Sequence, residues 1–225
     1  GFSIGPPFIF RLMVENAYNG TRESSMDIVT SCFQVHCLVL LELNFIEKSR
    51  PILAPMHPSH SSSVTSFQGL GIAPGLLEAL QKLHYSTPTP IQHQAIPPAI
   101  EGKDVVGVAQ TGTGKTLAFG IPMIQRLAQI KGQGLVLLPT RELALQVEEE
   151  FKKIGRSFGL RTAVLIGGAS MRPQMDAIRR NPNVIIATPG SLLDHLQQRT
   201  ITLNAVHILI LDEADLMLDM GFQPQ

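Results

Sequence analysis

A glycine-rich turn between an apolar run and a helical pattern constrains the fold of this chain more than any other feature. Residues 104–109 have the length of a buried strand, and the turn Gly112-Thr113-Gly114 follows. The pattern from residue 115 to about residue 129 predicts a helix. Glycine lets successive backbone N–H groups point at phosphate oxygens, and a helix N-terminus adds partial positive charge. The sequence therefore predicts a phosphate-binding loop in an α/β domain.

The side chains of this loop suit a nucleotide triphosphate and a magnesium ion. The predicted loop residues are Ala109, Gln110, Thr111, Gly112, Thr113, Gly114, Lys115 and Thr116. We expect Lys115 to reach the β and γ phosphates of ATP and the Thr116 hydroxyl to bind Mg²⁺. The strict pattern has glycine where Ala109 stands. A glycine-rich turn with a surface lysine is the alternative interpretation, and the flanking strand and helix disfavour it.

Two adjacent carboxylates follow a second apolar run. Residues 206–211 predict another buried strand, and Asp212 and Glu213 stand at its carboxyl end. Ligands of open parallel sheets lie outside the carboxyl ends of the strands, so these residues are expected beside the phosphate loop. We predict that Asp212 holds Mg²⁺, directly or through water, and that Glu213 orients or deprotonates the attacking water. An acidic helix N-terminus is the alternative. The predicted catalytic residues are Lys115, Thr116, Asp212 and Glu213.

Three more apolar runs, at 135–138, 163–166 and 184–187, are each followed by Thr, Gly or Pro and then by a helical pattern. Strands that alternate with helices predict a parallel sheet with right-handed crossovers. The loops carry hydroxyls, an arginine and helix N-termini, which bind phosphate without reading sequence. Ordinary strand-to-helix turns would contain similar residues. The candidate nucleic-acid contacts are Pro139, Thr140, Arg141, Gly167, Gly168, Thr188, Pro189 and Gly190.

In this order, the motifs over residues 64–225 resemble those of the DEAD-box ATP-dependent RNA helicases. The resemblance implies a RecA-like P-loop NTPase domain with a parallel sheet flanked by helices. It implies that ATP hydrolysis with Mg²⁺ is coupled to local unwinding of RNA. Phe67 would stack on adenine, because an aromatic face suits a purine. Gln92, at the end of the stretch 84–92, would hydrogen-bond the edge of the base, since a side-chain amide matches the N6/N7 pair.

The resemblance also implies that the stretches 139–141, 167–168 and 188–190 hold the RNA backbone. A second RecA-like domain of the same protein would follow residue 225 and complete the active site, so residues 64–225 would be an incomplete first domain. Two positions depart from the family pattern. Ser191 stands in place of an arginine and can cap the next helix. His84 stands in place of glycine and would cost roughly a kcal/mol if that position has positive φ.

Residues 1–63 carry no motif, and we expect a non-core extension that is disordered or not native. We hypothesise that translation of the native protein starts at Met56 and that the preceding segment packs poorly on the α/β domain. The apolar run 28–46 contains too many polar residues to span a membrane, so no membrane partner is expected. Both cysteines, Cys32 and Cys37, lie in this segment.

Charge and cysteine content narrow the setting in which the chain works. Lys plus Arg and Asp plus Glu each number 18, so the formal net charge is zero. RNA affinity must then come from local placement of charge and not from a basic surface. A cysteine-free enzymatic region is compatible with a cytoplasmic location. A P-loop ATPase that acts on DNA or protein remains an alternative, as does a piece that binds nucleotide or RNA weakly without turnover.

Overall fold

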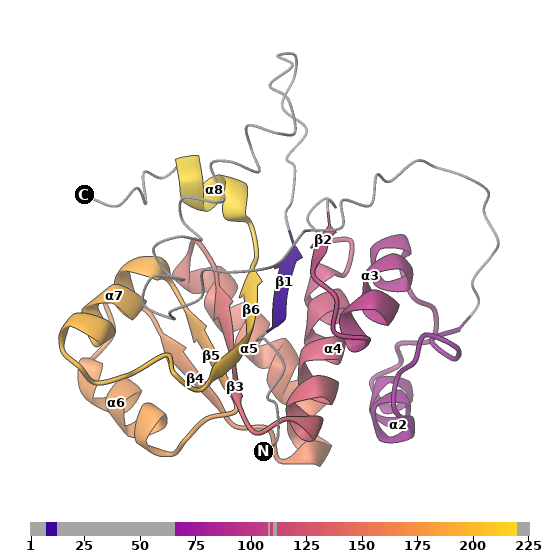
Figure 1. Cartoon of the computed structure of the whole chain (residues 1–225), viewed down its shortest axis with the longest axis horizontal. Helices are drawn as coiled ribbons and strands as arrows, with labels where there is room; N and C mark the ends of the chain where they lie inside the picture. Colours follow the sequence, from indigo (N-terminus) through magenta and orange to yellow (C-terminus); the bar gives the residue numbers. More distant parts are fainter. Residues whose placement is uncertain (1–7, 13–65, 108, 110–111, 220–225) are drawn as a thin grey trace, which may run out of the picture.

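The computed structural model describes residues 8–12, 66–107, 109 and 112–219, which form a parallel six-stranded sheet flanked by helices (Figure 1). The strand order is β2-β1-β6-β3-β5-β4, and every described pair is parallel. The strands are β1 Phe8–Leu12, β2 Val105–Gly107, β3 Gln133–Leu137, β4 Thr162–Leu165, β5 Val184–Ala187 and β6 Val206–Leu211. The predicted α/β fold class is confirmed, as are the apolar runs predicted to be its strands.

Helices connect consecutive strands on both faces of the sheet. They are α2 Pro74–Lys82, α3 Pro90–Ile100, α4 Lys115–Gln129, α5 Arg141–Gly155, α6 Met171–Arg179, α7 Pro189–Gln197 and α8 Ala214–Asp219, with a short 3₁₀ helix at Arg156–Phe158. The helix that was predicted to follow the glycine-rich turn is α4, with the expected bounds.

Alternate residues of the strands belong to two separate hydrophobic clusters, because side chains alternate across a strand. Val136 of β3 and Ile186 of β5 pack in the cluster that contains α3, α4 and α5. Leu135 and Ile185, their chain neighbours, pack in the opposite cluster with Leu192 of α7. Strands buried on both faces read as continuous apolar runs, and this is why the sequence pattern located them.

Strand β1 lies between β2 and β6 (indigo in Figure 1). Phe10 pairs with Val105 on one side and with Ile210 on the other. The expectation that the segment before residue 56 packs poorly on the α/β domain is therefore wrong for residues 8–12. Residues 13–65 lie outside the described residues, as do the two cysteines, so the boundary at residue 63 and the start at Met56 stay predictions.

Three helices end in a residue with positive φ that is not glycine. His84, Asn181 and Arg199 have φ of 62°, 53° and 53° and follow α2, α6 and α7. At the end of α2, the backbone N–H groups of His84 and Tyr85 donate to Gln81 and Leu80. Such left-handed closing residues are usually glycine because a Cβ atom is strained there. His84 thus has the positive φ at which histidine was expected to cost roughly a kcal/mol.

Among the described residues, no helix is both long and apolar enough to cross a lipid bilayer.

Candidate nucleotide site and nucleic-acid interface

The glycine-rich turn leaves β2 and leads directly into α4. Gly112 and Gly114 have φ of 80° and 84°, in the left-handed region that favours glycine. A Cβ atom on Gly114 would collide with the side-chain amide of Gln92, so close packing also requires glycine there. Gln110 and Thr111 lie outside the described residues, and Ala109 is half-buried. The backbone geometry at the start of α4 is that of an anion-binding loop.

Lys115, the first residue of α4, points its ammonium group into the protein. Its side chain is 7% exposed, and its Nζ lies 3.8 Å from Oδ1 of Asp212, which is equally buried. Nζ has no hydrogen-bond partner in this structure. Burying an ammonium group without hydrogen bonds is costly, and one carboxylate at this distance offsets only part of that cost. Phosphate oxygens beside Lys115 would supply the missing acceptors.

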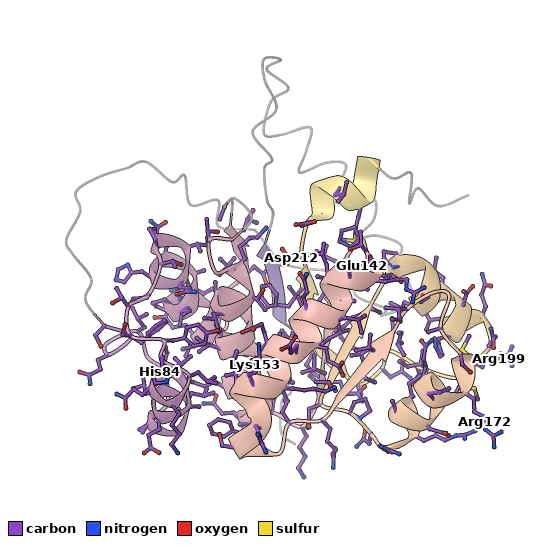
Figure 2. The ribbon with its side chains drawn as sticks, turned by 180° about the vertical axis from the view of Figure 1, so that it is seen from behind. His84, Glu142, Lys153, Arg172, Arg199 and Asp212 are labelled. Atoms are coloured by element: carbon purple, nitrogen blue, oxygen red, sulfur yellow. The ribbon has the colours of Figure 1, made fainter. Side chains whose placement is uncertain are left out.

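The carboxyl end of β6 supplies the acidic residues. The backbone N–H of Asp212 still bonds to Leu137 of β3 at 3.1 Å, so the sheet fixes the position of this residue. Glu213 then adopts φ of 54°, and its N–H donates to Asp212 Oδ1 at 3.1 Å. A non-glycine residue in this conformation costs about 1–3 kcal/mol. Figure 2 shows Asp212 at the same edge of the molecule as Glu142 in the first turn of α5.

A magnesium ion fits this donor set only together with a nucleotide. Within the described part of the chain, no three His, Cys, Asp or Glu residues gather as a metal site. Thr116 follows Lys115 in the chain, and Asp212 lies 3.8 Å from the Lys115 ammonium group. The protein would therefore offer Mg²⁺ the hydroxyl of Thr116 and the carboxylate of Asp212. Magnesium usually keeps several waters and binds one or two protein ligands plus phosphate oxygens. The residues present therefore suit Mg²⁺ held between the protein and a triphosphate.

Gln92 connects α3 to the phosphate loop. Its Oε1 accepts from the backbone N–H of Thr89 at 2.9 Å, and its Nε2 donates to the carbonyl of Gly114 at 3.0 Å. The residue is 3% exposed. Phe67 is 4% exposed and packs in the hydrophobic core, so little of it is open to a base in this structure. The roles of Phe67 and Gln92 in adenine binding stay predictions.

The three predicted RNA-contacting stretches meet at the carboxyl edge of the sheet. The backbone N–H of Leu138 bonds to Ala187, and that of Thr188 bonds to Leu165, so β3, β5 and β4 end side by side. A Cβ atom on Gly168 would collide with the guanidinium of Arg141, which places these two stretches in contact.

The third stretch joins them through Ser191. A Cβ atom on Gly167 would lie 3.6 Å from Ser191 Oγ. The interpretation of Ser191 as a helix cap is wrong, because Thr188 is the N-cap residue of α7 and Ser191 is its third residue. Ser191 is 7% exposed, and its Oγ accepts from Thr188 Oγ1 at 3.0 Å. The serine thus fills buried space beside the glycine loop instead of offering a cation to a ligand.

Two buried polar residues near these loops were not identified from the sequence. Gln174 of α6 and His195 of α7 are 8% and 1% exposed and contact one another. The only available signal was polarity at helix positions where the periodic pattern expects apolar residues. Burial lowers the pKa of His195, and the nearby negative charge of Asp194 opposes this shift.

A model of the DEAD/DEAH box helicase family matches residues 89–225. Among curated proteins, the ATP-dependent rRNA helicase RRP3 of Debaryomyces hansenii is 48% identical over 170 residues, which cover 74% of this chain and 36% of that protein. RRP3 of Lodderomyces elongisporus is 50% identical over 163 residues, 71% of this chain and 32% of that protein. The chain spans about a third of the length of these relatives.

Solved structures give the same result. The RNA helicase Prp28 from Chaetomium thermophilum bound to ADP aligns with TM-score 0.65 and 39% identity, covering 70% of this chain and 40% of that chain. A DEAD box protein from Methanococcus jannaschii aligns with TM-score 0.66 and 38% identity, covering 70% and 44%. The family match covers more than half of the chain, and the sheet carries the phosphate loop and acidic pair at its carboxyl edge. The chain belongs to the DEAD/DEAH box helicase family.

Proposed function

We propose that this domain binds Mg-ATP and forms the ATP-hydrolysing half of an RNA helicase. The observation that carries the proposal is Lys115, whose buried ammonium group lacks a hydrogen-bond partner and lies 3.8 Å from Asp212. A site of this kind is complete only when an anion with several oxygens enters it. The α4 N-terminus and the glycine turn supply the remaining donors.

The residues divide the chemistry among them. Lys115 binds the β and γ phosphates, and Gln92 and Phe67 are proposed to recognise adenine. Thr116 and Asp212 hold Mg²⁺, which when bound neutralises charge on the phosphate oxygens. Glu213 accepts a proton from the attacking water, or orients that water towards the γ phosphorus. As the water oxygen bonds to the γ phosphorus, the bond from that phosphorus to the β–γ bridging oxygen breaks and ADP departs with this oxygen, while a proton taken by Glu213 stays on its carboxyl group until it passes to solvent.

RNA is the proposed second ligand, held through its backbone. Support comes from the three stretches that meet beside Gly167 and Gly168, with Arg141 as the cation. A second RecA-like domain of the same protein is proposed to complete both sites. The names of the relatives make ribosomal RNA the first substrate to test. A cytoplasmic location is part of the same proposal, and a P-loop ATPase that acts on DNA or protein is its competitor.

The test begins with binding of a fluorescent ATP analogue to the chain, with and without Mg²⁺. We expect saturable binding that Lys115→Ala weakens by more than tenfold, since hydrogen bonds to charged groups contribute about 1.5–3 kcal/mol. ATP hydrolysis by the intact protein should rise on addition of single-stranded RNA and not of DNA. Equal stimulation by both would favour the competing ATPase, and no nucleotide binding would refute the proposal.

A further inference from the structure

The side chain of Gln174 fills the inside of the loop that carries Gly167 and Gly168. Its Oε1 accepts from the backbone N–H of Ile166 at 3.1 Å, and its Nε2 donates to the carbonyl of the same residue at 3.0 Å. Nε2 also lies 3.3 Å from the carbonyl of Ser170. Gln174 therefore binds both ends of the loop, and its amide pairs with Ile166 as a neighbouring strand would.

The same amide reaches a second element. His195 of α7 is 1% exposed, and its Nε2 lies 3.3 Å from Gln174 Oε1. The orientation of the Gln174 amide is fixed because Ile166 presents one donor and one acceptor to it. Oε1 can only accept, so Nε2 of His195 carries the proton. Nδ1 of His195 lies 2.7 Å from Thr200 Oγ1, which closes the chain of hydrogen bonds at the C-terminal end of α7.

The hydrogen-bonded pair of Gln174 and His195, called the bridge below, joins two of the proposed RNA-contacting stretches in the protein interior. The loop 166–170 contains Gly167 and Gly168, and α7 begins directly after Thr188. Two other contacts join these stretches: the Thr188 N–H donates to the carbonyl of Leu165, and a Cβ atom on Gly167 would lie 3.6 Å from the buried Ser191 Oγ. The buried bridge of Gln174 and His195 adds side-chain hydrogen bonds between the loop and α7 to these contacts. The amide of Gln174 has partners on both its oxygen and its nitrogen, and buried polar networks with such partners rigidify the segments they join.

We propose that Gln174 is a positioning residue for RNA, acting with His195 to hold the glycine loop and the N-terminus of α7 in one fixed arrangement. The proposal rests on the proposed RNA function. Phosphates bound by two backbone segments need those segments at a fixed spacing, and small displacements of such contacts are costly. Neither side chain touches the RNA. The arrangement leaves the nucleotide site untouched, since Lys115 and Asp212 lie at the ends of other strands.

Gln125 offers a matched control. It is another buried glutamine, also 8% exposed, and its Oε1 accepts from Ala73 N–H at 2.8 Å while its Nε2 donates to the carbonyl of Gly71 at 2.9 Å. It thus makes the same two-point contact with backbone, but it holds the chain before α2 and not a proposed RNA loop. Methionine matches glutamine in length and shape without hydrogen bonds, so Gln174→Met and Gln125→Met remove equivalent interactions.

The experiment measures hydrogen exchange and RNA affinity on the full chain. Gln174→Met should speed exchange of amides in 166–170 and also in 190–192, and His195→Leu should do so mainly in 190–192. Gln125→Met should affect 71–76 alone. Affinity for a labelled oligouridine should fall by about 3- to 10-fold in Gln174→Met and His195→Leu, as expected for one lost net hydrogen bond. Binding of a fluorescent ATP analogue should be unchanged in all three variants.

Two results would overturn the proposal. One is exchange in 190–192 that does not respond to Gln174→Met, because the bridge then transmits nothing to α7. The other is oligouridine affinity that falls equally in Gln174→Met and Gln125→Met, because general loss of stability would then explain it. If neither the wild-type chain nor the intact protein binds oligouridine, the RNA function itself fails. The exchange data still decide, separately, whether Gln174 couples the two segments.

Discussion

Glu213 combines a proposed catalytic role with a strained backbone, so substitutions there should separate stability from activity. Its φ is 54°, and no side chain other than hydrogen adopts this value without cost. Relief of the strain contributes about 1–3 kcal/mol. Glycine also gives the unfolded chain more conformational freedom, and this lowers the gain in folding stability by about 0.5–1 kcal/mol. The hydrogen bond from Glu213 N–H to Asp212 Oδ1 involves only the backbone of residue 213, so the substitution by glycine keeps it. Glu213→Gly should therefore stabilise the domain by about 0–2.5 kcal/mol, with a central value of about 1 kcal/mol.

Thermal unfolding followed by circular dichroism measures this change. For a chain of this size, 1 kcal/mol corresponds to about 2–4 °C in Tm, so the central value gives an expected increase of about 2–4 °C. Glu213→Gln keeps both the strain and the side-chain shape and should unfold at the wild-type temperature. In the intact protein both substitutions remove the proposed base and should lower kcat by about 10²-fold. The more stable variant would be an inactive one.

His84→Gly is the matched control, because His84 has φ of 62° and an exposed side chain at the end of α2, remote from Asp212 (Figure 2). It should raise Tm by a similar amount and leave ATP binding unchanged. If Tm rises in His84→Gly but falls in Glu213→Gly, the Glu213 side chain makes contacts that outweigh its backbone strain. A fall of Tm in both variants would show that positive φ at these residues does not destabilise the domain.

Four further outcomes are expected. Lys115→Ala should lower both affinity for ATP and turnover, measured by fluorescence titration and phosphate release, because the phosphate contact exists in ground and transition states. Gln92→Ala should reduce the preference for ATP over GTP in competition titrations by about 1–3 kcal/mol. Deletion of residues 1–12 should lower Tm by several degrees in a thermal scan, since it removes β1 from between two strands. Because the pKa of His195 is lowered in the folded state, this histidine is protonated at a higher pH in the unfolded chain than in the folded one. The free energy of unfolding of wild type relative to His195→Leu, measured with urea, should therefore fall as the pH drops below 6.5.

The sequence predicted the parts of the fold that depend on local pattern. The run at 206–211 became β6, and the helical pattern that starts at Lys115 became α4, with the expected bounds. Both are unambiguous because a doubly buried strand is continuously apolar and a glycine turn marks the helix start. The approach of Lys115 to Asp212 followed from topology alone, since carboxyl ends of parallel strands share an edge.

The sequence pattern could not predict contacts between residues that are far apart in the chain. Nothing in the spacing of Gln92 shows that its amide is already engaged by Thr89 and Gly114. Serine is a residue type that often caps helices, yet Thr188 and not Ser191 is the N-cap residue of α7. The reason is that β5 ends at Ala187 and α7 already begins at Pro189. Gln174 and His195 differ from ordinary surface residues only in burial, which depends on how α6 and α7 pack.

The backbone of strand β1 shows how a segment without a motif can matter for the spacing of a site. β2 leads into the phosphate loop and β6 leads into Asp212, and β1 pairs with both. Neighbouring strands lie about 4.8 Å apart, so one intervening strand separates the backbones of β2 and β6 by about 10 Å. The segments that follow β2 and β6 therefore start about this distance apart. Only a long side chain can cross it, and the ammonium group of Lys115, 3.8 Å from Asp212, does so. The spacing of the proposed site is therefore a property of the sheet order, and a parallel partner for both strands maintains it.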